Sequence, residues 1–250
     1  MILLLGGTRE SVEAAERLRL MGIPHLVTVA TDEGREALGG SDQAVRSGSL
    51  DCEGLKALIK EKAVELVLDC THPFAVEASS NAIRACADLR VRYLRLEREG
   101  LKRQDYPGLV RAEGFREAAA IAAESEGPVM LTIGVRHLGE FVPGKPGGPR
   151  TIARVLPTPA SIQRCRELGF ASRDIIAAQG PFSAGLNQAI FEEYQIRMVV
   201  TKDSGETGGV EAKLEAVMRM GIKLVLINRP KILYPEIVFT VDDLINEVVK

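Results

Sequence analysis

The residues best suited to chemistry lie in the segment Asp69-Cys-Thr-His-Pro-Phe-Ala75. The preceding run, Val64 to Leu68, is apolar apart from one glutamate, as in a strand that is covered on both faces. Pro73 suits the first turn of a helix. The segment is therefore expected where a buried strand ends and a helix begins, which is where open α/β sheets bind ligands. A helix entry built from Asp69, Thr71 and Pro73 is the simpler alternative.

A second candidate site is the turn Gly6-Gly7-Thr8, which follows the apolar run Ile2 to Leu5. Glycines at this place let the backbone approach a phosphate, and the amides of a following helix point toward it. The turn therefore predicts a dinucleotide site, with Gly6, Gly7 and Thr8 on the pyrophosphate. The full Gly-x-Gly-x-x-Gly fingerprint is absent, because Ser11 stands near the place of a third glycine. A tight turn that needs glycine for backbone reasons alone is the alternative.

The end of the next apolar run, His25 to Val29, would contact the adenosine ribose in a dinucleotide fold. Thr31 and Arg35 could hold a 2′-phosphate there, whereas Asp32 could accept hydrogen bonds from a free ribose diol. The segment therefore leaves NADPH and NADH both open as cofactors. A solvated loop with charged residues would have the same composition.

Polar residues also follow the apolar runs in the second half of the chain. They are Arg136, Gln179, Ser183, Lys202, Asp203 and Ser204. Because the carboxyl ends of parallel strands meet at one edge of a sheet, these side chains are expected to face a common cleft. Helix caps at Ser183 and Ser204, and an ion pair between Lys202 and Asp203, are the plain alternatives.

The elements that would position these residues alternate between strand and helix patterns. Strands are expected at 2–5, 25–29, 44–46, 66–69, 91–94, 129–133, 152–156, 175–178, 198–201 and 223–227, and helices at 10–20, 55–62, 77–89 and 241–249. Such alternation predicts an α/β fold with two Rossmann-like parallel-sheet domains and a ligand cleft between them.

A polar, turn-rich stretch at 97–108 places the domain boundary near residue 100. This gives an N-terminal dinucleotide-binding domain, 1–100, and a C-terminal substrate or cofactor domain, 101–250. The closing helix could pack on either half. The Pro- and Gly-rich segment 143–149 is the rival linker.

The composition excludes several classes of protein. The 250 residues carry a formal net charge of −2 with interspersed charges, so no nucleic-acid partner is expected. The four cysteines lie far apart without Cys-x-x-Cys spacing, which indicates reduced thiols and no metal site. The apolar start of the chain is too short to span a membrane, and no basic segment precedes it as in a signal peptide. We therefore expect a cytoplasmic protein with a small-molecule ligand.

Several motifs together resemble the precorrin-6A reductase family of corrin biosynthesis. They are Leu5-Gly-Gly-Thr8, Asp69-x-Thr-His-Pro-Phe-Ala75, Tyr93-Leu-Arg-Leu-Glu-Arg98, Gln179-Gly-Pro-Phe-Ser183, Thr201-Lys-Asp-Ser-Gly205 and Arg229-Pro230, and they cover nearly the whole chain. The resemblance implies an oxidoreductase that uses NADPH or NADH to reduce one double bond of precorrin-6A, or of cobalt-precorrin-6A, to the 6B form in cobalamin biosynthesis. The segment 29–35 looks more like the cobalt-precorrin branch.

Under this resemblance, a proton must reach the carbon beside the one that receives hydride, and the candidate donors are His72, Asp203 and water. Thr71 would lie near the cofactor. The acetate and propionate groups of the tetrapyrrole would be bound by Arg136, Gln179, Ser183, Lys202 and Ser204, with Arg154 and Arg95 as further cations. The alternative function is a noncatalytic tetrapyrrole carrier, which would bind the macrocycle without oxidising reduced nicotinamide.

Overall fold

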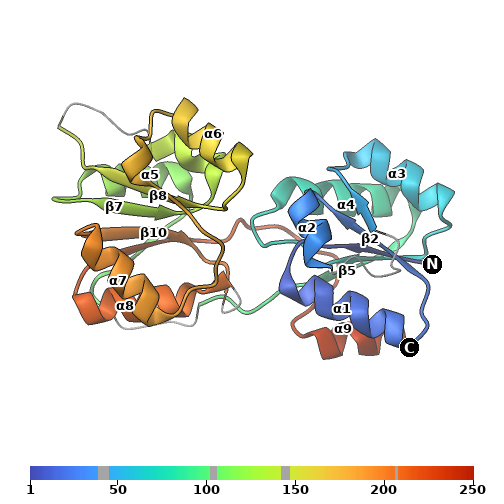
Figure 1. Cartoon of the computed structure of the whole chain (residues 1–250). Helices are drawn as coiled ribbons and strands as arrows, with labels where there is room; N and C mark the ends of the chain where they lie inside the picture. The colour runs from blue at the N-terminus through green and yellow to red at the C-terminus, as the bar shows by residue number, and fades with distance from the viewer. Residues whose placement is uncertain (39–44, 102–105, 142–146, 206–207) are drawn as a thin grey trace. The chain divides into compact units, whose positions relative to one another are not determined.

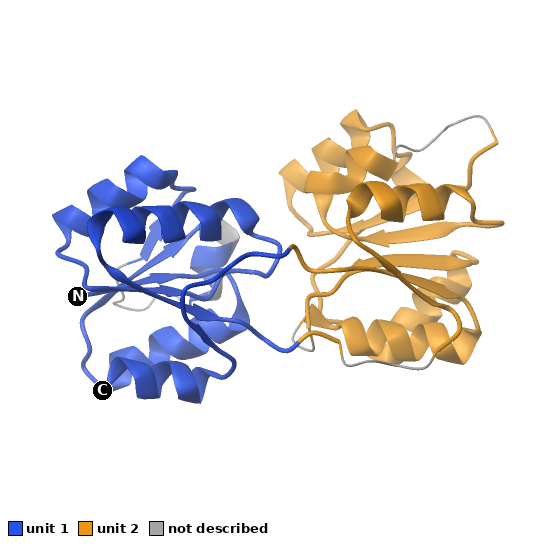
Figure 2. Ribbon diagram, turned by 180° about the vertical axis from the view of Figure 1, so that it is seen from behind, with its two compact units in different colours: residues 1–99, 231–250 blue, residues 100–230 orange. Residues whose placement is uncertain are grey.

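The computed structural model describes residues 1–250 except 39–44, 102–105, 142–146 and 206–207. The chain forms two compact units (Figure 2). Unit 1 consists of Met1–Glu99 and Lys231–Lys250, and unit 2 of Gly100–Pro230. The chain therefore passes from one unit to the other twice, after Glu99 and after Pro230.

Unit 1 is a parallel sheet between two layers of helices (Figure 1). Its strands are β1 (Ile2–Leu5), β2 (His25–Val29), β3 (Val45–Ser47), β4 (Leu66–Asp69), β5 (Arg92–Leu96) and β12 (Ile237–Val238), in the order β12-β5-β4-β1-β2-β3. Its helices are α1 (Arg9–Leu20), α2 (Asp32–Ala37), α3 (Cys52–Glu61), α4 (Val76–Leu89) and α9 (Val241–Val248).

Strand residues alternate between the two faces of this sheet, because successive side chains point to opposite sides. Ile2 and Leu4 pack against the apolar faces of α1 and α9. Leu3 and Leu5 pack against α3 and α4 on the opposite face. Both faces are covered, which is why the strands are continuous apolar runs rather than alternating patterns.

The last strand of unit 1 comes from the C-terminal end of the chain. Residues 237–238 of β12 pair in parallel with Arg95 and Leu96 of β5. Helix α9 then packs beside α1, where Leu244 and Ile245 join the core. The predicted division placed residues 231–250 in the second domain, whereas strand pairing and packing put them in unit 1.

Unit 2 is also a parallel sheet with helices on both faces. Its strands are β6 (Leu109–Ala112), β7 (Val129–Thr132), β8 (Thr151–Val155), β9 (Ile175–Ala177), β10 (Met198–Lys202) and β11 (Lys223–Ile227), in the order β6-β11-β10-β7-β8-β9. Its helices are α5 (Phe115–Ala123), η1 (Val135–Phe141), α6 (Pro159–Glu167), η2 (Ser172–Asp174), α7 (Ala184–Glu193) and α8 (Val210–Met220). The rival linker at 143–149 lies partly outside the described residues.

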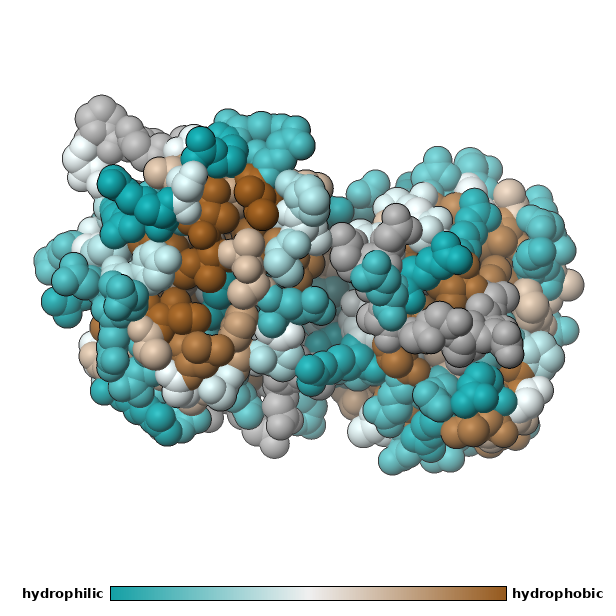
Figure 3. All heavy atoms as spheres, viewed as in Figure 1, coloured by the Kyte–Doolittle hydropathy of each residue, from teal (hydrophilic) through white to brown (hydrophobic). Residues whose placement is uncertain are grey.

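The core of unit 2 follows the same alternation. Met130, Val199 and Leu224 pack against α7 and α8 on one face, and α5 and α6 cover the other. Strand β9 is the short edge strand of the sheet, and hydrophobic residues reach the surface between α6 and α7 beside it (Figure 3). Leu156, between β8 and α6, and Leu186, in α7, are exposed apolar side chains.

The two units share the usual Rossmann strand order, with a sixth strand taken from elsewhere in the chain. From β3 the unit 1 order is 3-2-1-4-5, followed by β12. In unit 2 the strands β9-β8-β7-β10-β11 follow the same order when they are numbered from β7. The sixth place is taken by β6, which precedes the other five in the chain. The predicted α/β fold with two parallel Rossmann-like sheets is confirmed. The strand order reverses between β1 and β4 in unit 1, and between β7 and β10 in unit 2. In parallel α/β sheets ligands bind at such reversal points of the strand order.

None of the helices in the described part of the chain is both long enough and apolar enough to traverse a lipid bilayer. Within the same residues, no group of three or more His, Cys, Asp and Glu side chains is arranged to hold a metal ion.

Candidate functional site

The glycine turn and the Thr-His-Pro-Phe segment meet at the reversal point of unit 1. Strands β1 and β4 are direct neighbours, with Leu5 opposite Asp69. Thr8 Oγ1 donates to the carbonyl oxygen of Cys70 at 2.8 Å, which ties the two turns together. The structure thus brings the residues that follow β1 next to those that follow β4.

The glycine turn leads into a helix that is already capped from within. Gly7 has φ +111°, a conformation that L side chains rarely adopt. Ser11 Oγ accepts from the amides of Gly7 at 3.1 Å and Thr8 at 3.0 Å, and Thr8 Oγ1 accepts from the Ser11 amide. A Cβ on Gly6 would lie 3.2 Å from Ser11 Oγ, so the serine fills the space beside this glycine. The amides of Gly7 and Thr8 are therefore already taken by Ser11, and a phosphate at this turn would instead approach the exposed Cα of Gly7 and the first turn of α1.

A buried polar network centred on Asp69 supports the turn that follows β4. Its carboxylate accepts from the Thr71 amide at 2.9 Å, Thr71 Oγ1 at 2.7 Å, Ser79 Oγ at 2.6 Å, Tyr93 OH at 2.5 Å and Arg95 NH1 at 2.8 Å. Burial alone would raise the pKa of Asp69, but the Arg95 charge and these hydrogen bonds outweigh it and lower the pKa. The network fixes Thr71, and with it the backbone that carries His72.

Arg95 belongs to this network and not to a substrate site. It is fully buried, donates from Nε to Glu97 Oε2 at 2.8 Å, and lies 5.1 Å over the ring of Tyr234. The expectation that Arg95 is a further cation for substrate carboxylates is therefore wrong, because its charge is used by Asp69 and Glu97. Tyr234 comes from the returning C-terminal segment, so that segment also supports the turn.

His72 is half-buried, and its ring is held by the backbone that follows it. Nδ1 accepts from the Phe74 amide at 3.1 Å. A neutral ring with this bond carries its proton on Nε2. Helix α4 then begins at Val76, and no side chain caps it. A hydrogen-bond donor and an uncapped helix N-terminus thus lie within a few residues of each other.

Thr31 and Arg35 lie at the end of β2. Thr31 is the N-cap of α2, and its Oγ1 accepts from the Gly34 amide at 3.3 Å. Arg35 is exposed in the last turn of this short helix. Thr31 therefore has a structural role, and the Arg35 guanidinium is accessible to solvent.

In unit 2, the predicted residues from β7 and β10 come together at the reversal point. Thr132 lies opposite Thr201 on these neighbouring strands. Arg136, in η1, follows β7, and Lys202, at the end of β10, is half-buried. Burial, and next the charge of Arg136, lower the pKa of Lys202 to about 8. The two cations therefore face the same region.

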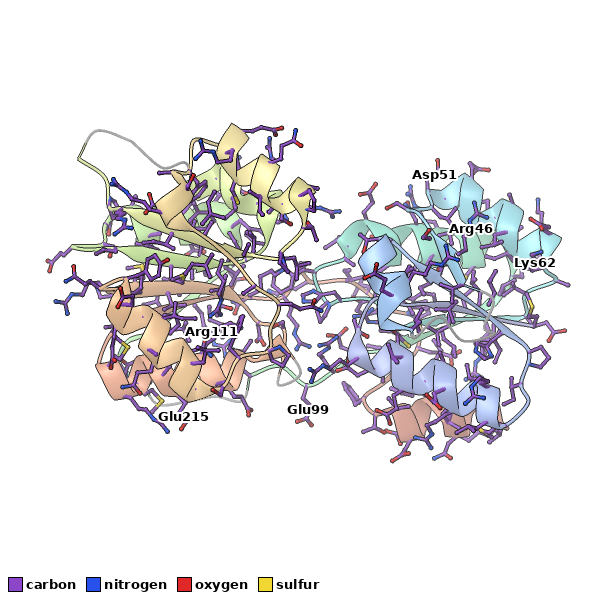
Figure 4. All side chains as sticks on the ribbon, in the orientation of Figure 1. Arg46, Asp51, Lys62, Glu99, Arg111 and Glu215 are labelled. Carbon is purple, nitrogen blue, oxygen red and sulfur yellow. The ribbon has the colours of Figure 1, made fainter. Side chains whose placement is uncertain are left out.

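Asp203 forms hydrogen bonds with both segments by which the chain enters and leaves unit 2. Its Oδ1 accepts from the Leu101 amide at 2.9 Å, and its carbonyl oxygen accepts from Arg229 Nε at 2.9 Å. Arg111 NH1, on the arginine labelled in Figure 4, lies 3.7 Å from Asp203 Oδ2. Arg229 NH2 lies 3.8 Å from Asp203 Oδ1. The carboxylate is thus engaged by the Leu101 amide and two guanidinium groups, which is a positioning arrangement.

Ser204 and the glycines after it are packed closely. Ser204 is buried, and a Cβ on Gly208 would overlap its Oγ and Cβ. Gly209 has φ +69° and precedes α8, which no side chain caps. Glycine is therefore required at 208 for space and at 209 for its backbone conformation.

The Gly-Pro-Phe-Ser segment lies over the next strand. Ser183 caps α7, because its Oγ accepts from the Leu186 amide at 3.2 Å. A helix cap was the alternative to a ligand-binding role for this residue. Gln179 is exposed. Arg154, in β8, lies 4.6 Å over the ring of Phe182 and donates to Asn187 Oδ1 at 2.8 Å.

Two contributors to this region, Asn187 and Lys213, were not expected from the sequence. Asn187 is fully buried and donates to the carbonyls of Phe182 and Ser183. Lys213 is buried in α8. The available signal was its spacing: it lies three residues after Val210 and one before Leu214, on the apolar face of the helix.

Comparisons with known proteins agree over the whole chain. A family model described as precorrin-6x reductase CbiJ/CobK matches residues 1–249. A cobalt-precorrin-6A reductase of Priestia megaterium is 35% identical over 251 residues, covering 100% of this chain and 98% of that protein. A precorrin-6A reductase of Mycobacterium tuberculosis is 30% identical, covering 92% and 88%. The solved structure of CobK precorrin-6A reductase matches with a TM-score of 0.83 at 26% identity, covering 99% and 96%. The chain therefore belongs to the precorrin-6x reductase family.

Proposed function

We propose that this protein uses NADPH or NADH to reduce one double bond of cobalt-precorrin-6A, giving the 6B form in cobalamin biosynthesis. The observation that carries the proposal is a full-length family match in a chain whose two Rossmann sheets both carry polar residues at their reversal points. The cobalt form is preferred over metal-free precorrin-6A because the cobalt-precorrin relative is the more similar of the two, at 35% against 30% identity.

The reaction requires one hydride and one proton. A reduced nicotinamide, when bound, supplies the hydride to one carbon of the conjugated macrocycle and becomes oxidised. A proton then joins the neighbouring carbon, so that one double bond becomes a single bond. The protein has mainly to hold donor and acceptor in register and to admit the proton.

We assign the cofactor to the reversal point of unit 1. Gly6, Gly7 and Thr8 would contact the pyrophosphate, and Thr71 would lie beside it. The fit to a dinucleotide is supported by the exposed, positive-φ backbone of Gly7, where an added Cβ would meet no atom of the residues that the structure describes within 4 Å. The uncapped start of α4 offers a second set of amides for an anion. Thr31 and Arg35 would lie toward the adenosine ribose, where Arg35 suits a 2′-phosphate.

We assign the substrate to the corresponding edge of unit 2. Its residues are Arg136, Gln179, Ser183, Lys202 and Ser204. Acetate and propionate groups require cations and polar donors spread over an area, and the pair formed by Arg136 and Lys202 provides adjoining positive charges.

For the proton, His72 is the better of the two side-chain candidates. Its ring lies at the turn beside the cofactor residues and presents an N–H at Nε2. Asp203 holds the Leu101 amide and adjoins Arg111 and Arg229, so we assign it a positioning role.

The test is an anaerobic assay of the purified protein with cobalt-precorrin-6A and with precorrin-6A, each with NADPH and with NADH. We expect one nicotinamide to be oxidised for each macrocycle in which a double bond is reduced. The cobalt form should react faster. Binding of the macrocycle without nicotinamide oxidation would refute the proposal and indicate a tetrapyrrole carrier.

A further inference from the structure

Tyr234 is the residue through which the returning C-terminal segment reaches the polar network of unit 1. The segment belongs to unit 1 from Lys231 onward. Leu233 and Pro235, on either side of Tyr234, are exposed, the first of them by 96%, whereas Tyr234 is half-buried. Its side chain packs against the core on the α3 and α4 face of the sheet. Of these three consecutive residues, the tyrosine is therefore the one that turns inward.

Strand pairing fixes the place of Tyr234 in the fold. The Arg95 amide donates to the carbonyl oxygen of Glu236 at 2.9 Å, and the Glu97 amide donates to that of Val238 at 2.9 Å. These bonds belong to the parallel pairing of β12 with β5. Tyr234 precedes the first of them by two residues, so the sheet itself holds its ring near Arg95.

The guanidinium of Arg95 is fixed both in its plane and on one face. In the plane, NH1 lies 2.8 Å from Asp69 Oδ1, and Nε lies 2.8 Å from Glu97 Oε2. On the face, the ring centroid of Tyr234 lies 5.1 Å from Cζ. Arg95 is fully buried and Tyr234 is only half-buried. The ring therefore separates this face of the guanidinium from solvent.

Arg95 connects this packing to the turn that carries His72. Its NH1 also donates to Thr71 Oγ1 at 3.1 Å. Thr71 directly precedes His72, and the His72 ring is held in turn by the Phe74 amide. A displacement of the guanidinium would therefore move Thr71 first and the His72 ring with it.

The hydroxyl of Tyr234 reaches the same network by a second route. Burial raises the pKa of Tyr234, and the charges of Glu97 and Asp69 add to this, while Arg95 and a hydrogen bond with Ser79 act against it. The phenol is therefore neutral at physiological pH, and Arg95 faces an uncharged ring. Ser79 Oγ donates to Asp69 Oδ2 at 2.6 Å, so the hydroxyl acts on this carboxylate through Ser79.

We propose that Tyr234 is a positioning residue for the reduction, because its ring covers Arg95 and thereby holds Thr71 and His72 in the arrangement that delivers the proton. This inference rests on the proposed function for the role of His72. It means that a residue close to the C-terminal end of the chain completes a site built from the N-terminal half.

Loss of the ring would weaken the network without removing any of its charged members. Water would reach the guanidinium, and the attraction between Arg95 and its carboxylates would fall as the local dielectric constant rises. The turn would then be held less firmly. A shift of about 1 Å at a reacting group can cost about 100-fold in rate, so a partial loosening should lower kcat.

The test compares three variants of the full chain. Tyr234→Phe keeps the ring over Arg95 and removes the hydroxyl, whereas Tyr234→Ala removes both. Tyr194→Ala is the matched control, because the half-buried Tyr194 covers Arg150 in unit 2 with 5.9 Å between its ring centroid and Cζ. Chemical denaturation measures the stability of each variant, and Tyr234→Leu takes the place of the alanine variant should the latter not fold.

The kinetic readout is the split between kcat and KM for cobalt-precorrin-6A. We expect Tyr234→Ala to lower kcat about tenfold and to leave KM within about twofold of the parent, because the residue positions the proton donor. Tyr234→Phe should keep at least about half of the parental kcat, since the ring is retained. Tyr194→Ala should lose stability and keep the parental kcat.

The second readout is independent of activity and uses the ligand-free protein. The chain has three histidines, His25, His72 and His137, so the ring-proton signals of His72 in NMR spectra can be assigned by their loss in His72→Asn. Tyr234→Ala is expected to shift or broaden the His72 signals and to leave those of the other two histidines in place. Tyr234→Phe and Tyr194→Ala should leave all three unchanged.

Two results would overturn the inference. A Tyr234→Ala variant that loses stability but keeps its kcat and its His72 signals would give Tyr234 a packing role alone. A raised KM for the nicotinamide with the parental kcat would make Tyr234 part of the cofactor site instead. Failure of the parent to oxidise nicotinamide would refute the proposed function, whereas the NMR comparison would still decide whether Tyr234 positions His72.

Discussion

Asp69 and Arg95 form a completely buried ion pair on neighbouring strands of unit 1, with 2.8 Å between Oδ1 and NH1. The pair lies directly before the turn that carries Thr71 and His72, and NH1 of Arg95 also donates to Thr71 Oγ1 at 3.1 Å. The same carboxylate receives two bonds from Thr71. The ion pair therefore sets the position of the residues proposed to lie beside the cofactor.

Removing one partner of this pair should be strongly destabilising. Arg95→Met leaves the Asp69 carboxylate buried without its cation, and we expect unfolding free energy to fall by about 3–5 kcal/mol in chemical denaturation. Arg92→Met is the matched control on the same strand, because Arg92 pairs with Glu236 and Glu247 at the surface. It should cost about 1 kcal/mol or less. Equal losses for the two variants would contradict a special role for the buried pair.

The ion pair between Asp69 and Arg95 should also affect how the free energy of unfolding changes with pH in acid. The folded protein holds the pKa of Asp69 below its usual range, so the unfolded chain binds this proton more readily. The stabilisation is present above the unfolded pKa of about 3.9 and is lost as pH falls through the folded value. The stability difference between the parent and Asp69→Asn should therefore be constant near neutral pH and shrink below about pH 4. A difference that does not change down to about pH 2 would contradict the lowered pKa.

Much of the architecture could be predicted because parallel strands buried on both faces are short apolar runs. Each expected strand overlaps an observed one, and the residues after β1, β4 and β10 lie at the reversal points. Strands β6 and β12 were missed. Each lies at a sheet edge and pairs with a strand distant in sequence, β6 with β11 and β12 with β5, so no local pattern marks it. The assignment of residues 231–250 to unit 1 depends on that long-range pairing.

Charged residues in strands and helices show where sequence reasoning fails at the site. Arg95 and Arg154 each lie within a strand, directly between two apolar residues. The sequence cannot tell that the first has a buried carboxylate partner, whereas the second has an amide and a ring. Lys213 was missed because a lysine in an amphipathic helix is usually solvated. Only the packing reveals which of these cations is available for a ligand.

His72 can be tested with two variants that differ in one hydrogen bond. Asparagine offers an acceptor in place of Nδ1 for the Phe74 amide, whereas alanine offers none. We expect His72→Asn to retain the fold and to lower the reduction rate at least about tenfold, because it lacks the ring N–H of Nε2. His72→Ala should lower the rate and also destabilise the turn by about 1 kcal/mol.

The measurements are the rate of cobalt-precorrin-6A reduction across neutral pH and the free energy of unfolding of each variant. A His72→Asn variant with the parental rate would show that the ring only shapes the turn. Water would then be the proton donor.

Gly208 should tolerate no side chain unless Ser204 is shortened. A Cβ at 208 would overlap both Oγ and Cβ of Ser204, and among the described residues these are the only atoms that it would meet within 4 Å. We expect Gly208→Ala to destabilise the protein by about 1–3 kcal/mol through overpacking. The second change Ser204→Gly removes both obstructing atoms, so the double variant should regain most of the loss.

The matched control is Gly185→Ala in the first turn of α7, where an added Cβ would meet no atom of the described part of the chain within 4 Å. It should be neutral or stabilising by up to about 1 kcal/mol. Because Ser204 is also proposed to bind substrate, the double variant should recover stability in chemical denaturation and yet keep a raised KM for cobalt-precorrin-6A. Recovery of both would leave Ser204 with a packing role alone, and recovery of neither would mean that the backbone at Gly208, rather than the contact with Ser204, excludes alanine.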